Sequence, residues 1–488
     1  MATDAHARVT WREVFSVREF RGMFYAQLAS LVGDQLAKVA LAILVYNRTG
    51  SPLLAALTYG VTFLPALISG PLLGVLADTR PRRSLMIVCD LARAGIVALM
   101  LIPGLPVAAL LTLLFAVSAL DPPFNAARAA LLPDVLAGER YAVGQALTGV
   151  TLQVSQVVGF GVGGALVVAL TPRGALAVDV GTFLLSATLL RFSVAHRPAP
   201  AAPDASSRWV LISAGAREVV AAPLLRNLVG ITAASFAMII ATEGLAVSYA
   251  HQLGRGDTAV GLLTAAVPLG ASVGLVALAR VPAERRLPTL RLLAVLWPLP
   301  LIATVLRPPV AVTIVIWALT GALSSFQLIG NVLFAQALTG ANRGRAFAFA
   351  QSLLIAVQGL GVIIAGGLAE LTTPADAIAL MAFAGLLACG CLVVSLGRLA
   401  HSSTGASSPV DNYRYEGVAR GSAIEHAQSS PARDQPASTM VEPSPDISAL
   451  RDETPRLYVV RVYAMSLIAL GVCFAAVIMA DWHPVRHA

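Results

Sequence analysis

The sequence predicts an all-α polytopic membrane protein built from two six-helix halves of the kind found in membrane transporters, with an extra transmembrane helix at the C-terminus. Composition is the first observation behind this prediction. Of the 488 residues, 57% are hydrophobic and only 12% are charged, against about 25% charged residues in a typical soluble domain. The second observation is that the apolar residues gather into runs close to the ~20 residues that a helix needs to cross a bilayer. The third is an internal repeat.

Twelve apolar runs occupy the chain up to Arg398. They cover residues 22–46, 53–77, 84–103, 106–127, 142–170, 175–192, 225–249, 259–279, 289–306, 309–335, 346–370 and 376–397. The longest polar break among them, residues 193–224, is expected to be a cytoplasmic central loop. It separates an N-terminal six-helix half (1–192) from a C-terminal six-helix half (225–399).

The two halves share sequence patterns. The stretch GPLLGVLADTRPRR (70–83) returns in outline about 200 residues later as GASVGLVALARVPAERR (270–286), with the glycine spacing and the paired arginines kept. A Q-x2-G-x4-G pattern at 156–164 recurs at 358–366. Two independent matches near one offset indicate a duplicated six-span unit. Parallel repeats with a binding site between them are a transporter architecture.

Arginine residues predict the orientation of the chain. With the N-terminus in the cytoplasm, the outer loops hold only Arg48, Arg173, Arg255 and Arg307, and the inner loops and inner helix ends hold most of the others. The positive-inside rule therefore favours a cytoplasmic N-terminus. The charged first twenty residues leave no room for the apolar core of a signal peptide. Because arginine replaces lysine almost everywhere, the expected location is the inner membrane of a bacterial cell.

The chain changes character after Arg398. Residues 400–456 are rich in Ser, Pro and charged residues, which predicts a disordered cytoplasmic linker. The run VYAMSLIALGVCFAAVIMA (462–480) then has no charged residue and is long enough to span a bilayer. The sequence predicts that segment 457–488 adds a thirteenth span and leaves the C-terminus outside. A helix on the membrane surface or packed against the bundle is the alternative.

Composition and motifs exclude several classes of function. The net charge of +8 reflects arginines at span ends and does not indicate nucleic-acid binding. The only lysine, Lys38, is followed by Val39, so a P-loop for ATP is absent. The four cysteines lie in apolar runs without zinc-site or disulfide spacing. Ser272 occupies the one G-x-S-x-G match, but in an apolar helical run rather than a hydrolase turn. We expect no enzyme, no metal and no cofactor.

The strongest motif is GVLADTRPRRSLM (74–86). It resembles the signature loop between spans two and three of the major facilitator superfamily, with Thr79 and Pro81 departing from the usual pattern. The resemblance implies that a cytoplasmic latch joins the two halves in one conformation. Its residues are Gly74, Asp78, Arg82 and Arg83. A carboxylate at a helix end can pair with arginine and with a neighbouring helix N-terminus, which agrees with this role.

The resemblance extends over most of residues 15–398. The segments VGDQLAKVALAILVYNRTGSP, CDLARA, ALLPDVL and NRGRAFAFAQS are similar to the macrolide-efflux and enterobactin-exporter branch of drug:proton antiporters. GFGVGG (159–164) is similar to the fifth-span antiporter motif, with Phe160 in place of proline. The resemblance implies a multidrug-type antiporter of the plasma membrane. It would export a small amphipathic compound, such as a drug, siderophore or metabolite, in exchange for protons by alternating access.

Asp34 and Lys38 lie near the middle of the first apolar run, four residues apart and therefore on one helix face. Intramembrane charges are costly and usually pair or face a polar cavity. Two interpretations follow. The residues form a helix-stabilising pair, or they face the central cavity and couple transport to protons. In the second case, a proton on Asp34 would change the balance between inside-open and outside-open states.

Other polar residues of the apolar runs have weaker signals. Asp90 and Arg93 are three residues apart in the third run, as in a buried ion pair. Five further residues could bind substrate in the cavity or bond to neighbouring helices. They are Gln153, Gln156, Glu243, Gln327 and Asn331.

Alternative functions stay open at this point. Within the same fold, the chain could be a uniporter, an importer or a lysophospholipid carrier. From another class, it could be a non-transporting membrane scaffold or receptor whose tail binds partners. The expected partners are a small-molecule substrate, protons and the lipid bilayer, with no nucleic acid. The sequence does not indicate an oligomeric state.

Overall fold

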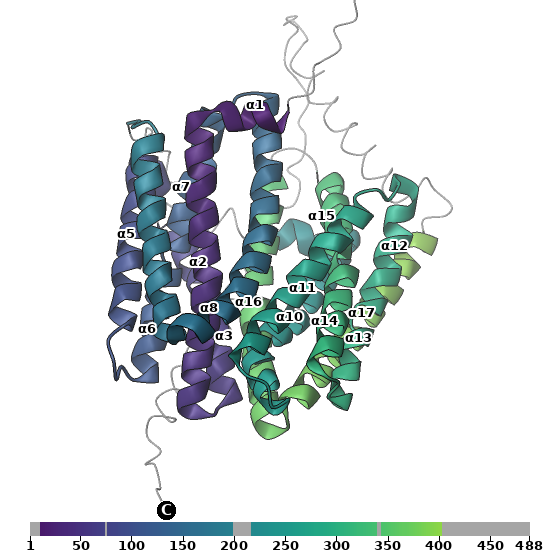
Figure 1. Cartoon of the computed structure of the whole chain (residues 1–488). Helices are drawn as coiled ribbons and strands as arrows, with labels where there is room; N and C mark the ends of the chain where they lie inside the picture. The colour runs from purple at the N-terminus through teal and green to yellow at the C-terminus, as the bar shows by residue number, and fades with distance from the viewer. Residues whose placement is uncertain (1–9, 74–75, 199–215, 339–342, 403–488) are drawn as a thin grey trace, which may run out of the picture.

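The structure is a computed structural model that describes residues 10–73, 76–198, 216–338 and 343–402. Its described secondary structure is helical, as the sequence predicts. Gly74 of the predicted latch, the predicted linker beyond residue 402 and the predicted thirteenth span lie outside these residues. Figure 1 shows two bundles side by side, with the purple-to-blue helices of the first half beside the teal-to-green helices of the second.

The first half contains the helices α1 to α8. Their bounds are α1 (Trp11–Ser16), α2 (Arg18–Thr49), α3 (Pro52–Leu73), α4 (Leu76–Thr79), α5 (Arg82–Met100), α6 (Val107–Ser118), α7 (Asp121–Val135) and α8 (Glu139–Ser193). Proline sets several of these boundaries, since it lacks the N–H that a helix interior needs. Pro81 precedes α5, and α7 begins with prolines at its first positions, where that N–H is not required. Helices α6 and α7 together form the fourth predicted span.

The second half contains the helices α10 to α17. Their bounds are α10 (Pro223–Gln252), α11 (Asp257–Leu278), α12 (Ala283–Leu296), α13 (Leu299–Ile302), a 3-10 turn (Ala303–Leu306), α14 (Val310–Ser324), α15 (Phe326–Ala337), α16 (Arg343–Leu371) and α17 (Pro374–Ser402). The ninth predicted span is thus divided between α12, α13 and the 3-10 turn, and the tenth between α14 and α15.

Helix α8 contains the fifth and sixth predicted spans. Its backbone leaves the helical region at Thr171, whose φ of 69° is unusual for a residue with a side chain. Pro172 follows directly, and the Thr171 hydroxyl accepts a hydrogen bond from the Gly174 N–H at 3.4 Å. The break therefore makes two arms, 139–170 and 172–193, out of one nominal helix.

Nine helical segments within the described residues are long and apolar enough to cross a membrane. The broken helix α8 counts once among the nine although it covers two predicted spans. Helix α5 is not among them because it carries four charged residues, Arg82, Arg83, Asp90 and Arg93. Helix α3 is also not among them, because only its part Pro52–Ala66 is counted, as a shorter apolar helix. With α8 counted as two spans and with α3 and α5 added, the nine segments correspond to the twelve predicted spans.

Small residues bring the two halves into close contact. A Cβ added at Gly164 of α8 would lie 2.6 Å from the Cα of Gly261 in α11, so the two backbones touch. A Cβ added at Gly366 of α16 would lie 3.1 Å from the Cα of Leu53 in α3. Glycine allows such an approach because it has no side chain.

Hydrogen bonds also join the two halves close to the contact between Gly366 and Leu53. The Glu370 carboxylate at the end of α16 accepts bonds from the Ser51 hydroxyl at 3.0 Å and the Leu53 N–H at 3.3 Å. The carboxylate thus caps the N-terminus of α3. Nearby, the rings of Tyr46 and His251 lie 4.8 Å apart.

Helix α1 lies across the end of the first bundle (Figure 1). Val14 on its inner side is fully buried, whereas Trp11 is 61% exposed. Phe15 meets Phe20 and Phe24 of α2 edge to face. This arrangement is typical of an amphipathic helix at a membrane interface.

Candidate functional site

A cavity of about 250 Å³ lies inside the first half. Helices α2, α3, α5, α6, α7 and both arms of α8 contribute to its wall, so all six spans of that half take part. The polar residues of the wall are Asp34, Gln35, Lys38, Thr62, Ser118, Asp121, Asn125, Gln156 and Asp179. The remaining half of the lining residues are apolar. Small-molecule sites combine apolar walls with polar groups that orient the ligand, and this cavity has an unusually large polar share.

Asp34 and Lys38 both line this cavity. No ion pair within 4.0 Å is found between them among the described residues, whose ion pairs involve other side chains. Both are only partly buried. The geometry thus places them on the cavity wall and gives no direct Asp34–Lys38 salt bridge.

Arg93 is the centre of a buried ionic cluster beside the cavity. Its side chain is 2% exposed, and its guanidinium lies 2.5 Å from Asp121 Oδ1 and 3.7 Å from Asp90 Oδ1. The Ser186 hydroxyl donates a 2.6 Å hydrogen bond to Asp90. The structure therefore brings the predicted pair Asp90 and Arg93 together, and adds Asp121 of α7 as the nearer partner.

Two aromatic rings complete the surroundings of Arg93. Its guanidinium carbon lies 5.1 Å from the ring centre of Phe124 and 5.6 Å from that of Phe183. Such cation–π contacts stabilise a desolvated guanidinium. Arg93 therefore links α5 to α7 and to the second arm of α8.

Asp179 lies where the second arm of α8 presses against α2. A Cβ added at Gly33 would lie 2.3 Å from Asp179 Oδ1, so Gly33 makes room for this carboxylate. The Thr182 hydroxyl donates to Asp179 Oδ1 at 3.1 Å. Within the described ranges, no Arg, Lys or His nitrogen lies within 4.0 Å of the Asp179 carboxylate. Asp179 is therefore a buried cavity carboxylate with a neutral partner.

The five predicted substrate residues are not gathered at one place. Gln156 lines the cavity, and the side chain of Gln153 is not among those described. Glu243 of α10 is half-buried outside the cavity wall, although it interacts electrostatically with Lys38 and Tyr59. Gln327 and Asn331 belong to α15, in the other half.

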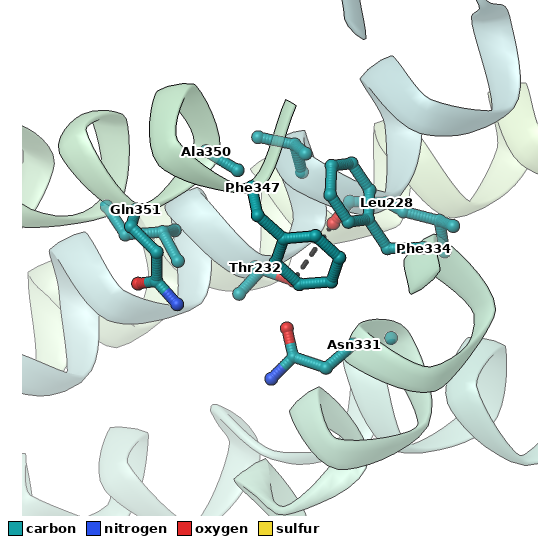
Figure 2. Close-up of a pocket in the computed structure, with 10 residues that line it drawn as sticks. Leu228, Thr232, Asn331, Phe334, Phe347, Ala350 and Gln351 are labelled. Carbon is teal, nitrogen blue, oxygen red and sulfur yellow. Dashed lines mark hydrogen bonds between the residues drawn. The ribbon is translucent and has the colours of Figure 1, made fainter. Parts of the chain in front are cut away.

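Asn331 lines a separate and much smaller pocket between α10, α15 and α16, of about 20 Å³. Figure 2 shows Asn331, Gln351 and the rings of Phe334 and Phe347 around it. The two rings meet edge to face at 5.0 Å, and the Thr232 hydroxyl bonds to the Leu228 carbonyl at 2.9 Å. This volume holds about one water molecule, so the pocket is too small for a substrate.

The predicted latch is described only in part. Arg82 forms a 2.6 Å ion pair with Asp134 of α7 and also bonds to the Ala130 carbonyl. Arg83 donates to the Arg191 carbonyl at the end of α8. Both contacts lie within the first half. Asp78 belongs to α4, and its side chain is not among those described.

Sequence analysis did not identify Gln35 or Asp179 as site residues. The Gln35 Oε1 atom is buried, lacks a hydrogen-bond partner and belongs to a residue that is 5% exposed. The only available signal was its place in the stretch GDQ, next to Asp34. Among the described residues, no group of three or more His, Cys, Asp and Glu side chains is arranged to hold a metal ion.

Solved structures share this fold. The nucleoside transporter NupG covers 77% of this chain and 99% of its own, with a TM-score of 0.64 and 12% identity. A bacterial homologue of the human lysosomal transporter Spinster, in an inward-facing and occupied conformation, covers 78% and 95%, with a TM-score of 0.59 and 14% identity. At these identities the likeness concerns the fold alone.

Sequence relatives cover much of the chain. The multidrug efflux pump Tap of Mycolicibacterium fortuitum is 26% identical over 364 residues, which span 71% of this chain and 88% of Tap. The enterobactin exporter EntS of Shigella boydii serotype 18 is 27% identical over 394 residues, spanning 77% and 91%. The uncharacterized MFS-type transporter YkuC of Bacillus subtilis is 28% identical over 184 residues, only 42% of its length.

The chain has the helical fold of multi-pass membrane transporters, and its relatives Tap and EntS are named as an efflux pump and an exporter. The family model of the Major Facilitator Superfamily matches residues 23–250. Over these residues the chain is similar to this superfamily, and its resemblance to Tap and EntS covers 71% and 77% of the chain.

Proposed function

We propose that this transporter exports a small amphipathic compound in exchange for protons, and that Asp34 carries the proton. The observation that carries the proposal is the position of Asp34 on the wall of the cavity, near the middle of its span. The relatives Tap and EntS, whose names describe an efflux pump and an exporter, support the outward direction.

Charged groups from four helices act on the Asp34 carboxylate. They are Lys38 on α2, Arg93 and Asp90 on α5, Asp121 on α7 and Asp179 on α8. Opposite charges favour the ionised carboxylate, whereas burial and the other carboxylates oppose it. Binding or release of one proton therefore changes the electrostatic energy of the whole cluster.

Alternating access turns this change into transport. The two halves rock between a state open to the cytoplasm and a state open to the outside. A proton entering from the outside neutralises Asp34, and its release to the cytoplasm restores the charge. If the two charge forms favour different states, the inward flow of protons drives export of the compound.

Contacts between the halves support an inward-facing assignment for this conformation. They include Ser51–Glu370, Tyr46–His251 and Gly366–Leu53, all at one end of the bundle. This end is the outer one if the N-terminus is cytoplasmic, as the arginine distribution predicts. The substrate path would then be closed outside and open inside.

The test is transport by the purified chain in proteoliposomes, with a panel of amphipathic compounds and with or without an imposed pH gradient. We expect gradient-driven transport by the wild type. Asp34→Asn should lower it at least tenfold while membrane insertion stays intact, because the asparagine amide cannot carry the proton. Glu284→Gln, which changes an acidic residue at an exposed position of α12, is the matched control.

Full gradient-driven transport by Asp34→Asn would refute the assignment of the proton to Asp34. Wild-type transport that does not depend on the pH gradient would instead indicate that the chain functions as a uniporter or an importer of the same fold.

A further inference from the structure

We propose that His251 makes the contact between the two halves dependent on pH, because its protonated ring holds Tyr46 of the opposite half more strongly than its neutral ring does. This role goes beyond the proposed function, since the proton on His251 is not the one that Asp34 is proposed to carry.

The rings of His251 and Tyr46 form a contact between the halves. His251 lies in the last turn of α10, and its ring centre is 4.8 Å from that of Tyr46 at the end of α2, with the ring planes inclined by 39°. Within the second half, Gln252 Oε1 accepts a hydrogen bond from the Ala375 N–H at 3.0 Å. This bond fixes the end of α10 to the start of α17, so the histidine ring has a rigid base.

Asp257 is the charged partner of His251. The His251 Nε2 atom lies 3.8 Å from Asp257 Oδ1, which is too long for a hydrogen bond, so the attraction depends on a charge on the imidazole. The two side chains are 35% and 26% exposed, and protons from the solvent therefore reach the ring. Histidine changes its charge between pH 5 and 8, and the C-terminal end of a helix favours the charged form.

The other charged groups at this end of the molecule have partners of their own or lie in loops. Glu370 and Asp376 accept hydrogen bonds from hydroxyl groups, and Glu370 also acts electrostatically on Tyr46. Arg48 of α2 donates to the Leu105 carbonyl of its own half at 2.7 Å. The complete set beside Asp257 is Arg48, Arg173, Arg255, Arg307, Glu370 and Asp376.

Only a contact that differs between two states can change their balance. His251 and Asp257 belong to the same half and stay together when the halves separate, so Asp257 favours the proton in both states. Tyr46 belongs to the other half and is lost when this end opens. A cation within ~6 Å of a tyrosine ring at an exposed site gains about two- to fivefold in an equilibrium.

The sign of the effect follows from this difference. The protonated ring is stabilised only in the closed state, so the added stability of that state is present at low pH and is lost as the pH rises. If this end is the outer one, an acidic exterior favours the state open to the cytoplasm. In that state the cavity receives the compound that is to be exported.

The test is pulsed EPR on the purified full-length chain in nanodiscs, in a variant without native cysteines. Spin labels at Ile102→Cys and Leu306→Cys, which are 50% and 79% exposed and belong to opposite halves, report how far this end is open. The labels are attached before the pH is set to about 5 or about 8. An Asp34→Asn background removes the pH response of the proposed coupling site.

In this background we expect the ratio of open to closed molecules to be about two- to fivefold lower at pH 5 than at pH 8. His251→Phe, which keeps a ring without the charge, and Tyr46→Leu should each remove this difference, whereas Tyr46→Phe should keep it. Asp257→Asn should move the response to lower pH without abolishing it. His196→Phe, at an exposed position beyond the other end of α8, is the matched control and should change nothing.

Size-exclusion and thermal unfolding profiles show whether each variant is folded. A ratio that does not depend on pH before His251 is changed would overturn the proposal, as would a pH response that survives His251→Phe or one that His196→Phe also removes. A pH-dependent contact in a chain without proton-coupled transport would leave this inference standing and refute only the antiport mechanism.

Discussion

At the scale of single residues, the first half contains charges where a soluble protein would place apolar side chains. Arg93 shows how they are accommodated. Its guanidinium has two carboxylates within 4.0 Å and two aromatic rings within 6 Å. Removing one partner from a buried ion pair costs about 3–5 kcal/mol, because the other charges are left uncompensated.

We therefore expect Arg93→Met to destabilise the protein by about 3–5 kcal/mol, since Asp90 would be left buried and unpaired. Thermal unfolding of the detergent-solubilised variant measures this. The double variant Arg93→Met with Asp90→Leu should regain part of the loss. Arg280→Met, at an exposed position of the second half, is the control. An unfolding midpoint for Arg93→Met equal to that of the wild type would contradict this role.

The limits of sequence reasoning are visible at this scale. The three-residue spacing of Asp90 and Arg93 was sufficient to predict their pairing, because neighbours on one helix face follow from helix geometry. Asp121 could not be assigned to Arg93, since it approaches from another helix. The same holds for Asp179, which meets α2 only through the packing of α8 at Gly33.

At the scale of helices, glycine decides how closely the halves approach. The backbones of α8 and α11 touch at Gly164 and Gly261, where a Cβ on either residue would lie less than 3.0 Å from the opposite backbone. Backbone atoms cannot move aside as a flexible side chain can, so a larger residue must separate the helices. The contact belongs to the interface between the halves, and we expect closure to depend on it.

Gly164→Ala should therefore weaken closure on the outer side. In a variant without native cysteines, Thr62→Cys in the cavity wall reports access from outside through a membrane-impermeant maleimide. We expect labelling of this cysteine in intact cells to rise severalfold when Gly164→Ala is added. Gly181→Ala is the matched control, because it lies on the same helix and a Cβ there has nothing within 4 Å. Equal labelling of the two variants would argue against the contact as part of the closure.

Helix positions were largely predictable from the sequence, because long apolar runs report directly on spans. The twelve predicted runs have helical counterparts in the structure, and its described residues are helical. The breaks within the predicted spans were harder to predict from the sequence. Pro122 and Pro123 begin a new helix inside the fourth run, and the backbone turn at Thr171 joins two runs in one helical segment.

At the scale of the whole molecule, the halves meet at one end through hydrogen bonds and small-residue contacts. Glu370 is the charged member of this contact and accepts from both Ser51 and the Leu53 N–H. A carboxylate at a helix N-terminus is favourable by about 0.3–1 kcal/mol when exposed. This energy is small, as a transporter requires, since a strong contact would prevent the change of state.

Glu370→Gln keeps an acceptor and removes the charge. We expect a loss of about 1 kcal/mol in the closed state, which corresponds to a roughly fivefold larger outward-open population. The Thr62→Cys accessibility assay measures that population. Asp376→Asn, which also removes a charge from the second half but from a carboxylate bonded to Thr373 of the same half, should have a smaller effect. Unchanged accessibility in Glu370→Gln would remove this residue from the gate.

The sequence was sufficient to predict the helical fold of the whole molecule. It was not sufficient to predict which residues line the cavity. The repeats predict two halves, and the arginine distribution predicts their orientation in the membrane. The cavity depends on which residues of six helices converge, and a single sequence does not contain that information. Gln35 illustrates the gap, because its unpaired oxygen becomes visible only when the neighbouring helices are in place.

The contact between Gly164 and Gly261 also has a mechanical consequence. From this contact to the start of α8 at Glu139 the first arm runs 25 residues, or about 37 Å at 1.5 Å per residue. If the contact is a fulcrum, this arm is a lever, and a tilt of roughly 10° displaces its far end by about 6 Å. A movement that barely disturbs the packing of two glycines is thus enlarged into an opening of small-molecule width at the opposite membrane face.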